Sequence, residues 1–214
     1  MGKENIFENE IKKFWTDYPM INSGLCDDYK RVPIAKIFDH MDKRLRSNIW
    51  YAQDQNEPIF SNFFDYRRYC GKKILEIGYG TGWLLEEFIK VGAEVYGIDL
   101  SEAHLDICKS RFRNRNVNLR LSIASWEQIP YPDNSFDLVV SHGVLHHTEN
   151  DENCVSEMQR VMKPGSKAFL MVYRKWSIKY CYQKMFKQGI LRLGLFKHKF
   201  NLERFMAMSE FVNK

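Results

Sequence analysis

The chain has 214 residues, of which 44% are hydrophobic and 28% charged, which suits one globular domain and excludes two full enzyme domains. Its five cysteines are scattered and none forms a CxxC pair, so we expect neither a disulfide scaffold nor a zinc module, and we expect a reducing, cytoplasmic compartment. Acidic residues interrupt every apolar run near Met1, and no run reaches the roughly 18 apolar residues of a membrane span. We therefore expect neither a signal peptide nor a transmembrane helix.

The net charge of +5 is unevenly distributed. Residues 174–200 contain eight Lys or Arg and no Asp or Glu, so the rest of the chain carries 24 positive and 27 negative side chains. A mildly acidic body with a basic segment differs from a uniformly basic nucleic-acid binder. We expect no nucleic-acid partner.

The chain divides into three zones. Residues 1–70 have apolar residues at helical spacing and predict a helical N-terminal extension or cap. Residues 71–173 alternate short β-type runs with helical ones, which predicts right-handed βαβ units and a mostly parallel sheet with helices on both faces. Residues 174–214 predict a basic, amphipathic, helical tail, and we expect it to be truncated.

The middle zone contains five expected strands and three expected helices. In chain order they are strand 73–77, helix 83–91, strand 94–98, helix 101–112, strand 118–123, strand 136–141, helix 150–162 and strand 168–173. Ser101 is the expected N-cap of the second of these helices, and Pro164-Gly165 ends the third.

A glycine-rich turn, residues 78–82, follows the first expected strand. Glycines allow a tight turn and let the backbone approach a ligand closely. Trp83 stands where a dinucleotide fingerprint needs a small residue, which disfavours a pyrophosphate ligand and a nicotinamide-dependent oxidoreductase. Asp99 ends the second strand, 21 residues after Gly78, where a carboxylate can accept hydrogen bonds from two ribose hydroxyls. The structural alternative for Asp99 is stabilisation of the next helix N-terminus.

Five segments resemble successive motifs of the class I S-adenosylmethionine (SAM)-dependent methyltransferases, and together they cover about residues 71–173. They are residues 74–82, 96–101, 129–139, 141–148 and 162–165. The resemblance is greatest to the small-molecule branch that includes quinone-biosynthesis methyltransferases. It implies a Rossmann-like, doubly wound sheet, SAM as cofactor, S-adenosylhomocysteine (SAH) as product, and methyl transfer to a small-molecule acceptor. The family fold normally ends with two more strands, which we expect to be missing here.

The resemblance also assigns residues to the cofactor, and it implies no metal. The assigned residues are Glu76, Gly78, Tyr79, Gly80, Gly82, Asp99, Leu100, Ser125, Trp126, Ser141 and His142. Glu76 and the glycine turn would face the methionine part of SAM, Asp99 would hold the ribose, and Leu100 would lie against the adenine. The backbone of Ser141 and His142 would pass the sulfonium.

One position departs from the family pattern. Ser125 stands where the family often has an aspartate that binds the adenine amino group. A serine hydroxyl can still accept one hydrogen bond, but it brings no charge. We expect SAM binding to survive, with Trp126 stacking on or covering the adenine.

Transfer of a methyl group from a sulfonium is an in-line displacement that depends mainly on alignment. A base is needed only when the acceptor must lose a proton. His142, His146 and His147 follow the fourth strand, where open α/β sheets bind ligands, and His146 is the catalytic candidate. The alternative for each histidine is a structural role.

The sequence allows more than one interpretation of the N-terminal zone, of the basic segment and of the activity. Aromatic residues of the N-terminal zone could line the acceptor site or only pack helices: Trp15, Tyr18, Trp50 and Tyr51. The basic segment 174–200 fits either peripheral contact with an anionic membrane or a packed helix or lid with a solvated basic face. The functional alternatives are a SAM-binding pseudoenzyme or partner subunit and, because Arg111, Arg113, Arg115 and Arg120 cluster, an RNA methyltransferase. The sequence leaves the oligomeric state unknown.

Overall fold

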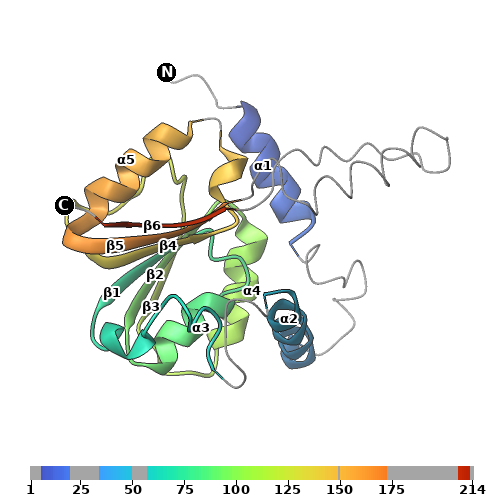
Figure 1. Ribbon diagram of the computed structural model, residues 1–214. Helices are drawn as coiled ribbons and strands as arrows, with labels where there is room; N and C mark the ends of the chain where they lie inside the picture. The colour runs from blue at the N-terminus through green and yellow to red at the C-terminus, as the bar shows by residue number, and fades with distance from the viewer. Residues whose placement is uncertain (1–5, 20–33, 50–56, 149, 173–206, 213–214) are drawn as a thin grey trace, which may run out of the picture.

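A computed structural model describes residues 6–19, 34–49, 57–148, 150–172 and 207–212 (Figure 1). Its helices are α1 (Ile6–Asp17), α2 (Ile34–Asn48), η4 (Tyr66–Tyr69), α3 (Trp83–Lys90), α4 (Glu102–Phe112), η5 (Leu145–His147) and α5 (Asp151–Val161), where η marks a 3-10 helix. Its strands are β1 (Lys73–Ile77), β2 (Glu94–Asp99), β3 (Leu119–Ile123), β4 (Phe136–His142), β5 (Met162–Val172) and β6 (Ala207–Val212).

The six strands form one sheet in the order β3-β2-β1-β4-β5-β6. The first five are parallel, and β6 is antiparallel to β5. The chain passes from β3 at one edge back to β4 beside β1, so the strand order reverses between β1 and β4. Open α/β sheets bind ligands at the carboxyl ends of the strands beside such a reversal. The predicted Rossmann-like, doubly wound architecture is confirmed.

Both faces of the sheet are covered by helices. Successive side chains of each strand point to opposite faces, and the apolar side chains on both faces are buried. Ile74 joins a cluster that includes Phe88 of α3 and Cys108 of α4. The next residue, Leu75, joins a second cluster that includes Met158 of α5. Helices α3 and α4 therefore cover one face and α5 covers the other, as Figure 1 shows.

The helix starts follow their capping residues. Ser101 caps α4 by accepting a hydrogen bond from the His104 amide, as predicted, and Asn150 caps α5 through the Asn153 amide. The fifth strand begins at Met162, six residues earlier than predicted, because β5 pairs with β4 from Phe136 onward across an irregular register.

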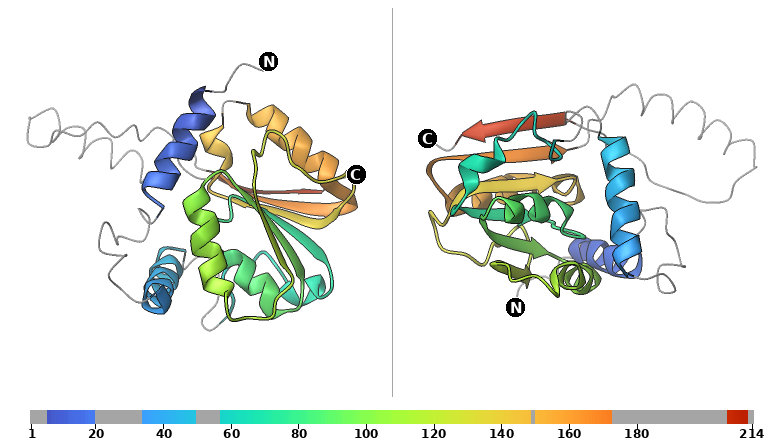
Figure 2. Two further views of the ribbon diagram at one scale, coloured as in Figure 1. Left: turned by 180° about the vertical axis from the view of Figure 1, so that it is seen from behind. Right: turned by 90° about the horizontal axis from the view of Figure 1, so that it is seen from below.

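Residues 207–212 form a strand that the sequence did not predict. These residues form β6 on the outer edge of β5 (Figure 2, right), with Ala168 opposite Phe211. Without β6, the long β5 would have an unpaired edge, and pairing satisfies its backbone groups. The tail is therefore not helical throughout. The basic segment 174–200 lies outside the described residues.

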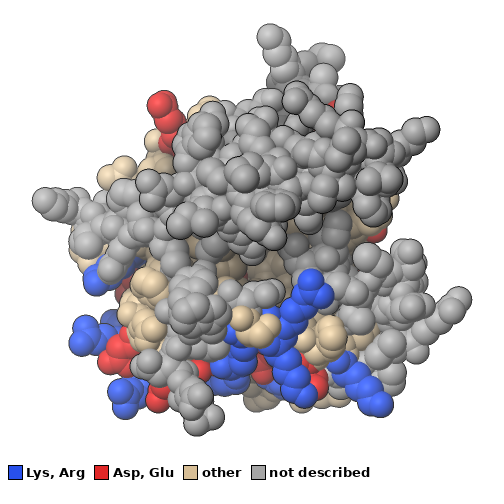
Figure 3. All heavy atoms as spheres, turned by 45° about the vertical axis from the view of Figure 1, so that its right-hand side comes forward, with Lys and Arg blue, Asp and Glu red and all other residues tan. Residues whose placement is uncertain are grey.

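In the N-terminal zone the structure describes α1, α2 and η4, and residues 57–65 form turns before η4. Helix α2 packs on α4 through Arg111, whose buried guanidinium pairs with Asp42 at 2.7 Å and with Glu86 at 2.6 Å. Trp50 and Tyr51 lie outside the described residues. On the face drawn in Figure 3, the described Lys and Arg side chains intermix with Asp and Glu. Across the described ranges, no helix combines the length and apolar character needed to cross a membrane.

Candidate functional site

The turn between β1 and α3 combines tight packing with open space. Gly78 and Gly80 both have left-handed backbones, with φ of 73° and 51°. A Cβ at Gly78 would lie 2.2 Å from Val144, so glycine is required for the turn to pack under the β4 loop. A Cβ at Gly80 would meet no atom within 4 Å, which leaves room for a ligand against the backbone. Gly82 begins α3 as its N-cap.

Buried polar atoms without partners gather at the carboxyl ends of β1 and β4. Seven buried side-chain polar atoms have no hydrogen-bond partner within the described ranges, and three of them are here: Glu76 Oε2, Ser141 Oγ and His142 Nε2. The two strands are neighbours, with Ile77 opposite Ser141. Because successive side chains of a strand point to opposite faces, Glu76 and His142 lie on the face that α3 and α4 cover, and Ser141 lies on the other face at the same edge of the sheet. Buried polar groups are nearly always paired, so these atoms at one edge of the sheet indicate a place where a polar ligand binds.

Glu76 has the electrostatics of a cation site. The residue is only 2% exposed. Burial raises its pKa well above the usual value, and the negative charge of Asp99 raises it further, against a smaller opposing hydrogen bond from the Leu85 backbone. A buried carboxylate without a counter-charge favours a ligand that brings a positive charge, such as an ammonium group.

His142 is held neutral beside Glu76. Burial lowers its pKa to about 4. Its ring packs against Phe60 at 5.2 Å and Trp83 at 5.3 Å between ring centroids. Phe60 has a left-handed backbone, with φ of 62°, which is rare for a bulky residue and often marks functional sites. At neutral pH the Nε2 atom of His142 can therefore act as a hydrogen-bond acceptor.

Asp99 ends β2, and its carboxylate is bound by the elements around it. The amides of Gly80 and Ser101 donate to its two oxygens at 3.0 and 2.9 Å. The Nδ1 atom of His104, on α4, lies 3.2 Å from both oxygens, and its Nε2 lies 3.3 Å from the carbonyl of Pro19. Burial alone lowers the pKa of His104, but the hydrogen bond and the charge of Asp99 outweigh it and raise the pKa. Asp99 thus faces the glycine turn, as a ribose-binding carboxylate requires.

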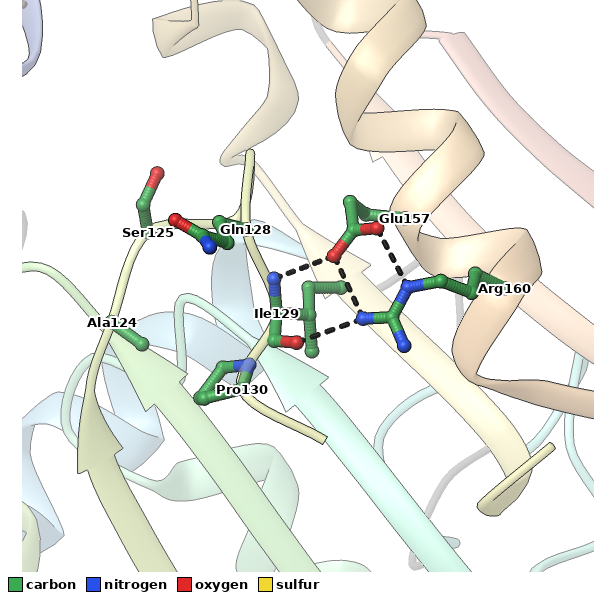
Figure 4. Close-up of a pocket in the computed structure, with 7 residues that line it drawn as sticks. All are labelled: Ala124, Ser125, Gln128, Ile129, Pro130, Glu157 and Arg160. Carbon is green, nitrogen blue, oxygen red and sulfur yellow. Dashed lines mark hydrogen bonds and ion pairs between the residues drawn. The ribbon is translucent and has the colours of Figure 1, made fainter. Parts of the chain in front are cut away.

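Ser125 lies on the connection between β3 and β4, which lines a groove of about 520 Å³ against α5 (Figure 4). Its hydroxyl donates to Glu8 of α1 at 3.1 Å and accepts from the Glu127 amide. On the other side of the groove, Glu157 and Arg160 hydrogen-bond the backbone of Ile129, which fixes this connection.

The remaining predicted cofactor residues are largely buried. Tyr79, Leu100 and Trp126 are 1%, 5% and 5% exposed. The Tyr79 ring packs on Gly97, where a Cβ would lie 2.5 Å from it, so Tyr79 faces the site with its backbone. Leu100 and Trp126 belong to the core cluster on the α5 face of the sheet. The backbone of His146 lies in η5, and the structure does not describe its side chain.

Sequence reasoning missed two residues that contact the site. His104 follows Asp99 by five residues on α4, so the helical pattern could have placed it near the carboxylate. Glu8 reaches Ser125 across 117 residues of chain, and no local pattern indicates that contact. No group of three His, Cys, Asp or Glu side chains is placed to hold a metal ion in the part of the chain that the structure describes.

Comparisons with known proteins match the middle of the chain. Residues 75–170 match a family model described as a methyltransferase domain. The chain is 38% identical over 109 residues to the ubiquinone/menaquinone biosynthesis C-methyltransferase UbiE of Cupriavidus metallidurans, and 38% identical over 110 residues to that of Chromobacterium violaceum. The matches cover 49% and 50% of this chain, and 44% and 45% of the relatives. The chain thus spans about half the length of the curated relatives it matches.

Two solved structures show the same fold. One is the [4+2]-cyclase SpnF, with a TM-score of 0.56 and 19% identity over 80% of this chain and 62% of that one. The other is a complex of the Haloferax volcanii Trm112 methyltransferase activator with a methyltransferase, with a TM-score of 0.52 and 16% identity over 73% of this chain and 66% of that one. At these identities the likeness extends to the fold alone.

Proposed function

We propose that residues 75–170, which match a methyltransferase-domain family model, form a class I SAM-dependent methyltransferase domain, and that the chain binds SAM and transfers its methyl group to a small-molecule acceptor, releasing SAH. The observation that carries the proposal is the set of unpartnered atoms of Glu76, Ser141 and His142 beside an open glycine turn.

The residues at the site fit the groups that SAM carries. Glu76 would accept the α-ammonium group, which supplies the positive charge that this buried carboxylate lacks. The amide backbone of the glycine turn would hold the methionine part, and Asp99 would accept the ribose hydroxyls. When bound, SAM supplies an already activated methyl group, so the protein has to align the acceptor and exclude water.

His142 is placed to orient the acceptor. Its neutral Nε2 atom, at the end of β4, can accept a hydrogen bond from a hydroxyl of the acceptor and fix its distance for in-line transfer. A histidine whose pKa is about 4 is too weak a base to take a proton at neutral pH without help. His146 stays the candidate for a general base when the acceptor must lose a proton.

A small-molecule acceptor is supported by the relatives, which are named as C-methyltransferases of ubiquinone and menaquinone biosynthesis. The alternative is a SAM-binding partner subunit without its own activity.

Two measurements test the proposal. Isothermal titration of the folded full-length chain is expected to show binding of SAM and SAH, and lack of affinity for both would contradict the proposal. Incubation with SAM and a metabolite extract is expected to release SAH and to produce a molecule heavier by one methylene, detected by mass spectrometry. Binding without turnover on any acceptor would support the partner subunit instead. Asp99→Asn is the matched site variant and is expected to lose affinity.

From the sequence we also propose that the protein is cytoplasmic and that residues 174–200 bind peripherally to a membrane. Co-sedimentation with anionic liposomes, compared between the full chain and a variant in which the eight basic residues are replaced by glutamine, tests the second. Equal sedimentation of the two proteins would contradict it.

A further inference from the structure

Helix α1 lies across the carboxyl ends of the strands, over the site (Figures 1 and 2). Ser101, after β2, donates to the carbonyl of Trp15 at 3.1 Å. The indole of Trp15 packs against His104 on α4 at 5.9 Å and against His147, after β4, at 5.7 Å between ring centroids. Lys12 pairs with Glu102 at 3.2 Å. One helix therefore contacts the segments that follow two different strands of the site.

A third contact brings a negative charge to the segment after β3. Glu8 Oε2 accepts the hydrogen bond from Ser125 at 3.1 Å, and the contact is partly buried. The segment that holds Ser125 lies beside Asp99, because Asp99 is opposite Ile123 and its carbonyl accepts from the Ala124 amide at 3.1 Å. Neighbouring strands are about 4.8 Å apart, so the Glu8–Ser125 pair lies at the strand end next to that of Asp99.

We propose that Glu8 is an adenine-selecting residue. Its carboxylate accepts a hydrogen bond from the amino group of the base whose ribose Asp99 holds. Helix α1 then covers the cofactor and distinguishes adenine from other bases. The proposal rests on the proposed function, since it assumes a SAM-type nucleoside. Ser125 offers a hydroxyl only, and it already donates to Glu8. The charged acceptor at this position therefore comes from α1, and a carboxylate accepts an N–H more strongly than a hydroxyl does.

The same chemistry predicts which base is refused. Adenine presents an amino group at its 6-position, whereas hypoxanthine presents a carbonyl oxygen there. A carboxylate accepts from the amino group and repels the carbonyl, and a buried unpaired polar group makes such discrimination strong. A glutamine at the same position can accept from the first base and donate to the second.

The experiment is isothermal titration of the full chain with SAH and with S-inosylhomocysteine, its 6-oxo analogue. Wild type is expected to prefer SAH by about 10–100-fold, and Glu8→Gln is expected to bring this ratio to within a few-fold of one. Glu10→Gln is the matched control, because Glu10 is an exposed residue of the same helix, and it is expected to keep the wild-type ratio. Far-UV circular dichroism checks that each variant is folded.

The outcomes separate the two proposals. A wild type that binds neither ligand contradicts the proposed function. A wild type that binds SAH, together with a Glu8→Gln variant whose ratio is unchanged, overturns the role of Glu8. Equal weakening of both ligands also overturns it, since that result means that Glu8 only fastens α1. The double variant Glu8→Gln with Ser125→Asp, which returns a carboxylate from the β3 side, is expected to restore the preference for SAH, and it repeats the ratio test if the single variant does not fold.

Discussion

Two polar clusters of this protein have opposite hydrogen-bonding states. At the carboxyl ends of β1 and β4, buried atoms of Glu76, Ser141 and His142 have no hydrogen-bond partner among the residues that the structure describes. Between α5 and the β3–β4 connection, Arg160 donates to the carbonyls of Ile129 and Tyr131 and to two carboxylates, all at 2.7–2.9 Å.

The difference distinguishes polar groups that stabilise the fold from polar groups that bind a ligand. Burying an unpaired polar group costs stability, so natural proteins keep such groups where another molecule completes them. A paired cluster such as that of Arg160 stabilises the folded chain and is expected to bind nothing further. Substitutions in the first cluster should therefore raise the stability of the ligand-free protein and lower its affinity for SAH. Substitutions in the second should lower stability and change the affinity for SAH less.

The largest effect is expected for Glu76→Gln. The amide keeps the shape of the side chain and removes its charge, so affinity for SAH is expected to fall by about 10–100-fold, as for the loss of a charge-assisted hydrogen bond. The same change is expected to stabilise the ligand-free protein, because a buried carboxylate without a counter-charge is unfavourable. Isothermal titration and urea unfolding measure the two effects.

The pH dependence of stability provides a second test of the role of Glu76. Because its pKa is raised in the folded state, the unfolded chain releases this proton first, and wild type loses stability as the pH rises above the ordinary value of 4.5. The advantage of Glu76→Gln should therefore grow with pH. A variant that is less stable than wild type at neutral pH, with unchanged SAH affinity, would show that Glu76 is a structural residue.

The fold could be predicted because its signals are local. The strand of residues 73–77 and the Ser101 cap follow from residue type and spacing, and both are confirmed. The strand of residues 207–212 could not be predicted, because it exists through pairing with β5 and has a weak pattern of its own. Non-local pairing of this kind leaves little trace in a short window of sequence.

Within the site, the sequence located the segments better than the side chains. The glycine turn and Asp99 are in contact through the Gly80 amide. Whether Tyr79 points to the ligand or to the core depends on the absence of a side chain at Gly97 on the neighbouring strand. Likewise, a contact such as that of Glu8 with Ser125 depends on how α1 docks and could not be read from local patterns.

Arg160→Ala tests the paired cluster and is expected to have the second-largest effect. Its removal leaves the carbonyls of Ile129 and Tyr131 without their donor, which should lower the free energy of unfolding by about 1–2 kcal/mol. The loss of SAH affinity should be much smaller than for Glu76→Gln. Arg113→Ala, at an exposed position just after α4, is the matched control for urea unfolding. A destabilisation no larger than that of the control would mean that the paired cluster contributes little to the fold.

The smallest effect is expected at His104, which combines features of the two clusters because it is buried and paired but lies beside the site. It faces the Asp99 carboxylate, the Trp15 ring and the Pro19 carbonyl. Since its pKa is raised in the folded protein, its contribution to stability is full below the ordinary value of 6.5 and is lost as the pH rises through the folded-state pKa. Urea unfolding at about pH 5 and about pH 8 should therefore show a larger loss of stability with pH in wild type than in His104→Gln. Parallel pH profiles for the two proteins would show that the pH dependence of stability does not come from the proton shared by His104 and Asp99, and would contradict the raised pKa of His104.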